Sequence, residues 1–123
     1  SANEPVSNPD ILEPPANNLP QDPHIPAPVL GQVMYDAKTS TVKIPVTAPG
    51  GNENYSAVVY IQRSSQPLGT FPVKYAKGFL SFSLALDEKT PTPGSYYFSA
   101  YFEDSKQAKI GPSSNTVKLI LTD

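Results

Sequence analysis

Residues 94–102 read GSYYFSAYF and residues 114–121 read SNTVKLIL, with a polar loop and a Gly-Pro-Ser-Ser segment between them. Apolar side chains occupy alternate positions in both stretches, which is the period of a β-strand with one buried face. The shared faces are Tyr96, Phe98, Ala100 and Phe102 in the first stretch and Val117, Leu119 and Leu121 in the second. The pattern is typical of the closing pair of strands of a small β-sandwich.

Five further short apolar runs precede this pair, separated by clusters of Gly, Pro, Asn, Asp and Ser. They cover residues 28–35, 41–47, 55–63, 70–75 and 79–86. No segment has helical periodicity, and seven short strands at roughly 8–12-residue spacing favour an all-β fold, a seven-stranded antiparallel β-sandwich. The predicted core is Val42, Ile44, Val46, Val59, Ile61, Leu80, Phe82, Leu84, Leu86, Tyr96, Phe98, Phe102, Val117, Leu119 and Leu121.

Two positions need separate predictions. Pro45 lacks a backbone N–H in what should be a central strand, so we expect a bulge or an early strand end there. Ser64–Gly69 is expected to be a turn because it is rich in small and polar residues.

The N-terminal segment differs in composition from the rest of the chain. Eight of the fifteen prolines lie in the first 28 residues. We therefore predict an extended proline-rich linker at 1–26 and one β-sandwich domain at 27–123. The chain starts with Ser1 and not with Met, so we expect it to be a piece of a longer, multidomain protein.

Charge and composition bear on the possible partners. The net charge is −2 with a pI near 5.3, and the basic residues are scattered, which argues against a nucleic-acid surface. No apolar run approaches 18 residues, so no membrane span is expected. The chain has no cysteine, which excludes disulfides and thiolate metal sites.

Residues able to carry catalysis or bind metal are few. His24, the only histidine, lies between prolines of the predicted linker, which cannot hold an imidazole beside a partner. The acidic pairs Asp87-Glu88 and Glu103-Asp104 lack the spacing of a calcium loop and are expected to be solvated turn residues. We therefore expect no catalytic residue, no metal site and no cofactor.

The candidate binding residues lie on the face opposite the predicted core. If Tyr96, Phe98 and Phe102 point inward, Tyr97 and Tyr101 point outward on the same strand. Tyr60 joins them if the third strand lies beside the sixth. Such an exposed aromatic face could stack on sugar rings, pack against a neighbouring domain, or form cross-strand pairs that stabilise the sheet.

Two short motifs resemble those of the fibronectin type III and bacterial immunoglobulin-like families. Pro93-Gly94-Ser95-Tyr96 is similar to the turn and tyrosine that open the sixth strand, and Gly111–Val117 is similar to the entry to the last strand. The resemblance covers about residues 28–123 and implies a buried tyrosine hydroxyl bonded to backbone at the corner between strands five and six. It also implies that the third strand lies beside the sixth, as the placement of Tyr60 requires. The tryptophan usual in the second strand of fibronectin type III domains is absent, as is an Arg-Gly-Asp loop.

The resemblance also implies a function class. Such domains are modular and extracellular, and they space, present or adhere without catalysing a reaction. We accordingly predict a non-enzymatic module of a secreted or surface-anchored bacterial protein that contacts neighbouring domains of its own chain, a host or cell-surface protein, or a glycan. The alternatives are an accessory carbohydrate-binding module of a polysaccharide-degrading enzyme and a phage or filament decoration domain.

Overall fold

The computed structural model describes residues 19–47, 55–86 and 90–122 of the chain. These residues form nine β-strands and no helix, so the predicted all-β class is confirmed. The strands are β1 (Val29–Leu30), β2 (Met34–Asp36), β3 (Thr41–Thr47), β4 (Ser56–Arg63), β5 (Gln66–Ala76), β6 (Phe79–Ser83), β7 (Gly94–Asp104), β8 (Lys109–Ile110) and β9 (Val117–Leu121). Within the described ranges, no helix is long and apolar enough to cross a membrane.

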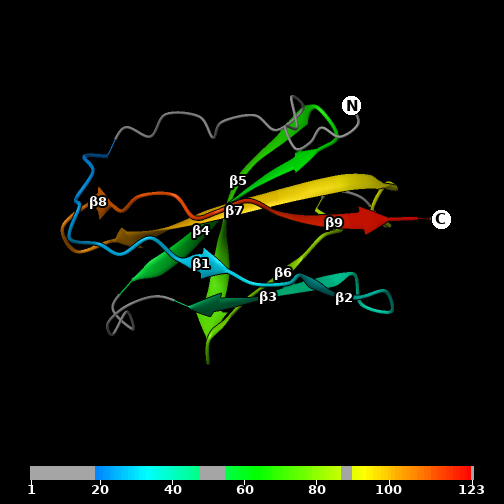
Figure 1. The fold of residues 1–123 in the computed structure, drawn as a ribbon, viewed down its shortest axis with the longest axis horizontal. Helices are drawn as coiled ribbons and strands as arrows, with labels where there is room; N and C mark the ends of the chain where they lie inside the picture. Colours follow the sequence, from blue (N-terminus) through cyan, green and yellow to red (C-terminus); the bar gives the residue numbers. More distant parts are fainter. Residues whose placement is uncertain (1–18, 48–54, 87–89, 123) are drawn as a thin grey trace, which may run out of the picture.

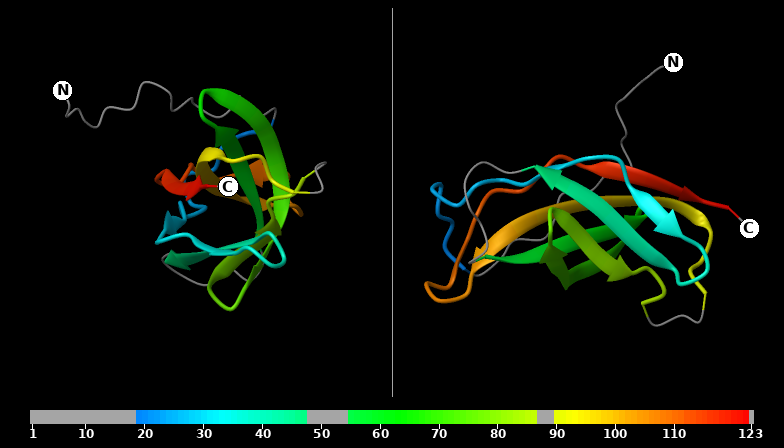
Figure 2. Two further views of the ribbon diagram at one scale, coloured as in Figure 1. Left: turned by 90° about the vertical axis from the view of Figure 1, so that its right-hand side faces the viewer. Right: turned by 90° about the horizontal axis from the view of Figure 1, so that it is seen from below.

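All nine strands belong to one antiparallel sheet that curves into an almost closed barrel (Figures 1 and 2). The strand order is β1-β3-β6-β5-β4-β7-β8, with β2 also paired to β3 and β9 also paired to β7. The long strand β5 makes the curvature possible because it changes partner along its length. It pairs with β4 as far as Val73 and with β6 from Lys74 onward.

The Asn115 side chain joins β1 to the segment between β8 and β9. The Asn115 side-chain amide donates to the carbonyl of Leu30 (3.0 Å), and its oxygen accepts the Leu30 N–H (2.8 Å). Asn115 follows a segment held against β7, where Ser114 N–H donates to the Ala100 carbonyl (2.7 Å). The amide thus supplies β1 with the donor and acceptor that a neighbouring strand would supply.

Residues at the C-terminal side of the predicted linker also pack on the domain. Ile25 is 2% exposed and belongs to the core, and the Asp22 N–H donates to the carbonyl of Ile110 (2.8 Å). Gly111 leaves room for the Ile25 side chain, because a Cβ at residue 111 would lie 2.5 Å from Cγ2 of Ile25. Residues 1–18 of the predicted linker lie outside the described residues.

Most of the predicted core is confirmed. Nine of the predicted side chains are buried: Val42, Ile44, Val59, Ile61, Leu80, Leu84, Tyr96, Phe98 and Phe102. Five more pack against them while partly exposed: Val46, Phe82, Val117, Leu119 and Leu121. Ile25, Leu30 and Ala57 join the core without having been predicted, and Ala100, predicted on the inward face, is also buried.

Leu86 was predicted in the core, and that prediction is wrong. It is 37% exposed, because β6 ends at Ser83 and the chain then leaves the sheet. Its backbone has a φ of 52°, a left-handed conformation that a strand cannot contain. Apolar residues still alternate in the sequence as far as Leu86, although the pairing of β6 with β3 ends at Ser83.

The predictions for Pro45 and for the turn at 64–69 are also corrected. Strand β3 continues through Pro45 to Thr47 and neither bulges nor ends at the proline. The pairing of β3 with β6 ends at Pro45, but the Pro45 carbonyl accepts the Gly31 N–H (2.8 Å) on the other side of the strand. The turn is confined to Ser64 and Ser65, and β5 begins at Gln66. A register shift between Ile61 and Gln62 accommodates the residues near Gly69.

The corner between β6 and β7 contains the hydrogen bond that the family resemblance implies. Tyr96 is 1% exposed, and its hydroxyl donates to the carbonyl of Thr92 (2.5 Å), four residues earlier. Its ring stacks with Phe98, the ring centroids lying 6.4 Å apart. The bond gives the buried phenol a partner and fixes the path of the chain as it enters β7.

Candidate functional site

The three candidate tyrosines share the face of the sheet opposite the core. Tyr60 on β4 pairs with Ser99 on β7, so Tyr97 and Tyr101, two residues to either side of Ser99, are its diagonal neighbours. Adjacent residues on both strands belong to the core, whereas these three do not. The predicted juxtaposition of the three tyrosines is confirmed.

Their predicted exposure is wrong for two of the three. Tyr60 is 4% exposed and Tyr97 is 7% exposed, while Tyr101 is half-buried. The ammonium of Lys118, the cross-strand neighbour of Tyr97, lies 5.7 Å from the centroid of that ring. Alternation gives the direction of a side chain but not what lies over it, so the sequence could not show this burial.

The burial changes what the tyrosine face can do. Stacking on a sugar requires an open ring face, and of the three rings only that of Tyr101 retains substantial exposed surface. Ile120, on the adjacent strand β9, is the most exposed large apolar residue among those described, at 61%. Tyr60 and Tyr97 are placed to stabilise the sheet through cross-strand contacts.

His24 lies in a turn next to Asp22. Its ring is 94% exposed and its Nδ1 lies 3.1 Å from the Asp22 carboxylate. The backbone N–H of His24 donates to the same carboxylate oxygen (2.9 Å), and this bond holds the pKa of Asp22 below its ordinary value. The contact stabilises the turn that directs Ile25 into the core.

The prediction that Glu103 and Asp104 are turn residues is wrong for Glu103, which lies within β7 and pairs with Ser56 and Ile110, while Asp104 ends the strand and begins a turn. Asp104 accepts the N–H groups of Lys106 and Gln107 at 3.1 and 3.2 Å, as an Asx-type turn residue does. Asp87 and Glu88 lie outside the described residues. Across the described ranges, no three His, Asp or Glu side chains lie close enough together to hold a metal ion.

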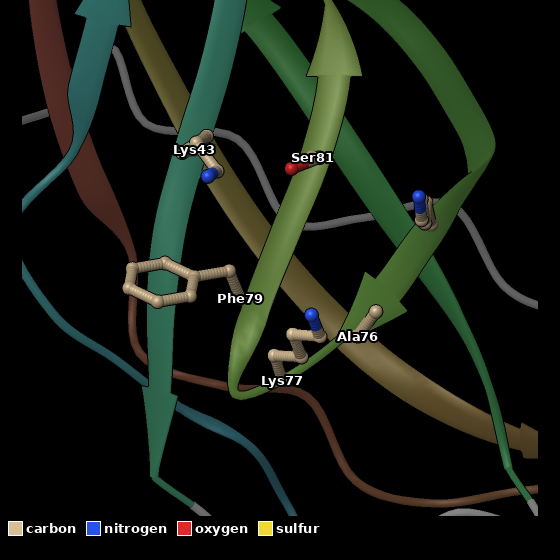
Figure 3. A pocket seen from close by; sticks show the side chains of 6 residues that line it. Lys43, Ala76, Lys77, Phe79 and Ser81 are labelled. Carbon is tan, nitrogen blue, oxygen red and sulfur yellow. The ribbon is translucent and has the colours of Figure 1, made fainter.

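A pocket that the sequence did not predict lies on the outer face of strands β3, β6 and β5 (Figure 3). It has a volume of about 300 Å³ and is lined by Lys43, Lys74, Ala76, Lys77, Phe79 and Ser81. The strand register explains why these residues meet. Lys43 pairs with Ser81 and Ser81 pairs with Lys74, which forms one row across three strands.

A second row beside the first is apolar. Pro45 pairs with Phe79, and Phe79 pairs with Ala76. The Lys43 ammonium lies 5.1 Å from the centroid of the Phe79 ring, so the two rows are in contact. The outward positions of Lys43 and Lys74 are readable from alternation in the sequence, but their convergence depends on the pairing of Lys43 with Ser81, 38 residues later in the chain.

No protein-family model matches the chain, and no curated protein matches it either.

Proposed function

We propose that the chain is a non-catalytic immunoglobulin-like module of a secreted or surface-anchored bacterial multidomain protein, acting in adhesion or as a structural spacer. The observation that carries the proposal is the Tyr96–Thr92 hydrogen bond at the β6–β7 corner, since this tyrosine corner is a hallmark of such domains. Their sandwich groups strands as β1-β3-β6 against β5-β4-β7-β9, an order that the observed pairing contains.

The proposed sandwich counts seven strands if β1 and β2 are two halves of one edge strand and β8 is an accessory to β7. Both β1 and β2 pair with the same side of β3, at its two ends, which supports this grouping. Since residues 19–26 pack on the domain, the proline-rich residues that precede them would act as the semi-rigid connection to a neighbouring domain.

The main alternative, an accessory carbohydrate-binding module, rests on the tyrosine face. The low exposure of Tyr60 and Tyr97 argues against sugar stacking on these two rings. A glycan array with the wild-type chain and Tyr101→Ala tests it, because Tyr101 is the half-buried member of the three. Array binding that Tyr101→Ala abolishes would favour the alternative over the spacer role.

The proposal is tested in cells that produce the full-length parent protein. Antibodies against residues 27–123 should label intact cells or detect the protein in the medium, and deletion of these residues should reduce attachment of the cells to their surface. Replacement by an unrelated β-sandwich of equal length restores attachment if the module is a spacer and does not if it is the adhesive unit. Labelling only after permeabilisation, or attachment unchanged by the deletion, would overturn the proposal.

A further inference from the structure

We infer that the pocket formed by Lys43, Lys74, Lys77, Phe79 and Ser81 binds an acidic sugar unit, a uronate or sulfated residue, of an anionic polysaccharide. The inference concerns a face of the domain other than the tyrosine face, and it goes beyond the proposed role as a module or spacer.

Positive charge is concentrated in the pocket, and no carboxylate of the described residues pairs with it. Lysine ammonium groups are charged at neutral pH, and three of the chain's nine basic residues line this one pocket. The carboxylates of the described residues are those of Asp22, Asp36, Glu103 and Asp104, and none of them forms a salt bridge with a pocket lysine. A chain with a net charge of −2 therefore presents a local site for an anion.

The arrangement of the lysines also favours a bound anion. Lys43 and Lys74 flank Ser81 on the two neighbouring strands, which places their Cα atoms about 10 Å apart. An anion bound between the two strands would be attracted by both ammonium groups. The Ser81 hydroxyl lies between the two and can donate a hydrogen bond to the same anion. In Figure 3 the Ser81 oxygen lies on the side of β6 that faces β3, while the Lys43 nitrogen lies toward the Phe79 ring.

The apolar row of Pro45, Phe79 and Ala76 lies beside the lysines and can contact the apolar face of a sugar. Phe79 is half-buried and forms one wall of the pocket, beside Ala76. A sugar ring has an apolar C–H face and polar edges, so a ring lying against Phe79 can direct its acidic substituent toward the lysine row. The pocket volume of about 300 Å³ is at the lower end for small-molecule sites, which suits a single sugar unit.

The same features favour a polysaccharide over the other polyanions. Phosphate groups of nucleic acids are commonly bound by arginine forks and extended basic stripes, but the only arginine, Arg63, does not line this pocket. Anionic membranes attract clusters of four to eight basic residues on a flat or helical surface. Three lysines around a concave site with an aromatic wall fit one acidic sugar ring better than they fit a nucleic acid or a membrane surface.

Lys77 offers a variant that should keep the fold. Lys77 and Gly78 connect β5 to β6, with φ values of 55° and 83°. Two positive φ values in a two-residue hairpin loop indicate a type I′ turn, in which Asn-Gly is strongly preferred. Lys77→Asn thus removes a pocket charge while improving the turn, so that a loss of binding cannot be ascribed to unfolding.

The test measures binding of the whole chain to fluorescently labelled polygalacturonate and dextran sulfate, with neutral dextran as the uncharged probe. We expect saturable, salt-sensitive binding to at least one acidic polymer and none to dextran. Lys43→Ser, Lys74→Ser and Lys77→Asn should each raise the Kd about two- to fivefold, the range expected for exposed charge pairs, and the triple variant about tenfold or more. Phe79→Ser should weaken binding without changing the net charge.

Lys106→Ser is the matched control, because Lys106 is exposed, lies in the turn before β8 and does not line the pocket. Its Kd should equal that of the wild type. An equal loss in Lys106→Ser, or binding to neither acidic polymer, would overturn the inference. Tighter binding to double-stranded DNA or to phosphatidylglycerol vesicles than to either polymer would also overturn it. Circular dichroism and thermal unfolding of each variant establish that the fold is retained.

Discussion

Asn115 has a structural role that its residue type alone does not indicate. Exposed Asn residues in loops commonly cap turns, but here both ends of the amide bond the backbone of Leu30, which is 4% exposed. The interaction spans 85 residues of sequence. It could be found only by folding the chain, because no local pattern links these two positions.

We predict that Asn115→Ala lowers the free energy of unfolding by about 1–3 kcal/mol, since it leaves a buried N–H and C=O of Leu30 unpaired. Asn115→Asp should have an intermediate effect, because it keeps the acceptor and loses the donor. Urea denaturation measures both, and hydrogen exchange of the Leu30 amide should accelerate. Thr116→Ala, at the exposed neighbouring position, is the control; a loss as large as that of Asn115→Ala would contradict the prediction.

The core residues show which part of the packing is readable one residue at a time. Val42, Ile44, Phe98 and their alternating partners were predicted correctly because they lie within paired strands, where alternation fixes the buried face. Leu86 was not, because it follows the last paired residue of β6. Ile25 was missed because its proline-rich surroundings indicate a linker, while a glycine 86 residues later leaves room for its side chain.

At the scale of elements, strand β5 is the unusual one. It contains Pro67 and Pro72, residues that disfavour a central strand. Among the described residues, 66–73 pair only with β4, and proline is tolerated on the side where no second strand pairs. Proline on an exposed edge also removes N–H groups that could pair with another molecule. The predicted turn at 64–69 was wrong because these prolines and Gly69 are typical of both a turn and a protected edge.

We predict that Pro72→Val promotes self-association, since it adds a backbone donor and a β-branched side chain to this edge. Sedimentation velocity should show a new population of dimers or larger species that grows with protein concentration. Thr70→Val is the matched control: it lies on the same face of the same strand and adds no donor. Association of both variants to the same extent would attribute the effect to surface hydrophobicity and contradict the role of proline.

At the scale of the whole molecule, the barrel-like sheet and residues 19–30 form one packed unit. Ile25 is in the core cluster, Leu30 is bonded to Asn115, and Asp22 is bonded to Ile110. The boundary predicted at residue 26 from proline content stays a prediction, but Ile25 on its N-terminal side contributes to the core. Composition shows where the chain is extended and does not show what an extended segment packs against.

We predict that a chain beginning at Ala27 is less stable than the full chain by at least about 2–5 kcal/mol, the cost of removing a buried isoleucine from a core. Ile25→Ala in the full chain should reproduce much of this loss. Val29→Ala, at a position that is 53% exposed, should change stability by no more than about 0.5 kcal/mol. Guanidinium unfolding of the four chains checks this, and an equal midpoint for residues 27–123 and the full chain would contradict it.

Period-two alternation was enough to predict the all-β class, the inward residues of β3, β7 and β9, and the common face of Tyr97 and Tyr101, because the direction of a side chain along a strand is a local property. Both faces of β4 are apolar, and the prediction of Tyr60 beside the other two tyrosines depended on the strand pairing that the family resemblance implies. The tertiary structure decided the rest. It buried two of those tyrosines, brought Ile25 against Gly111, and aligned Lys43, Ser81 and Lys74 across three strands. These features depend on register and on contacts between distant segments, which no local pattern encodes.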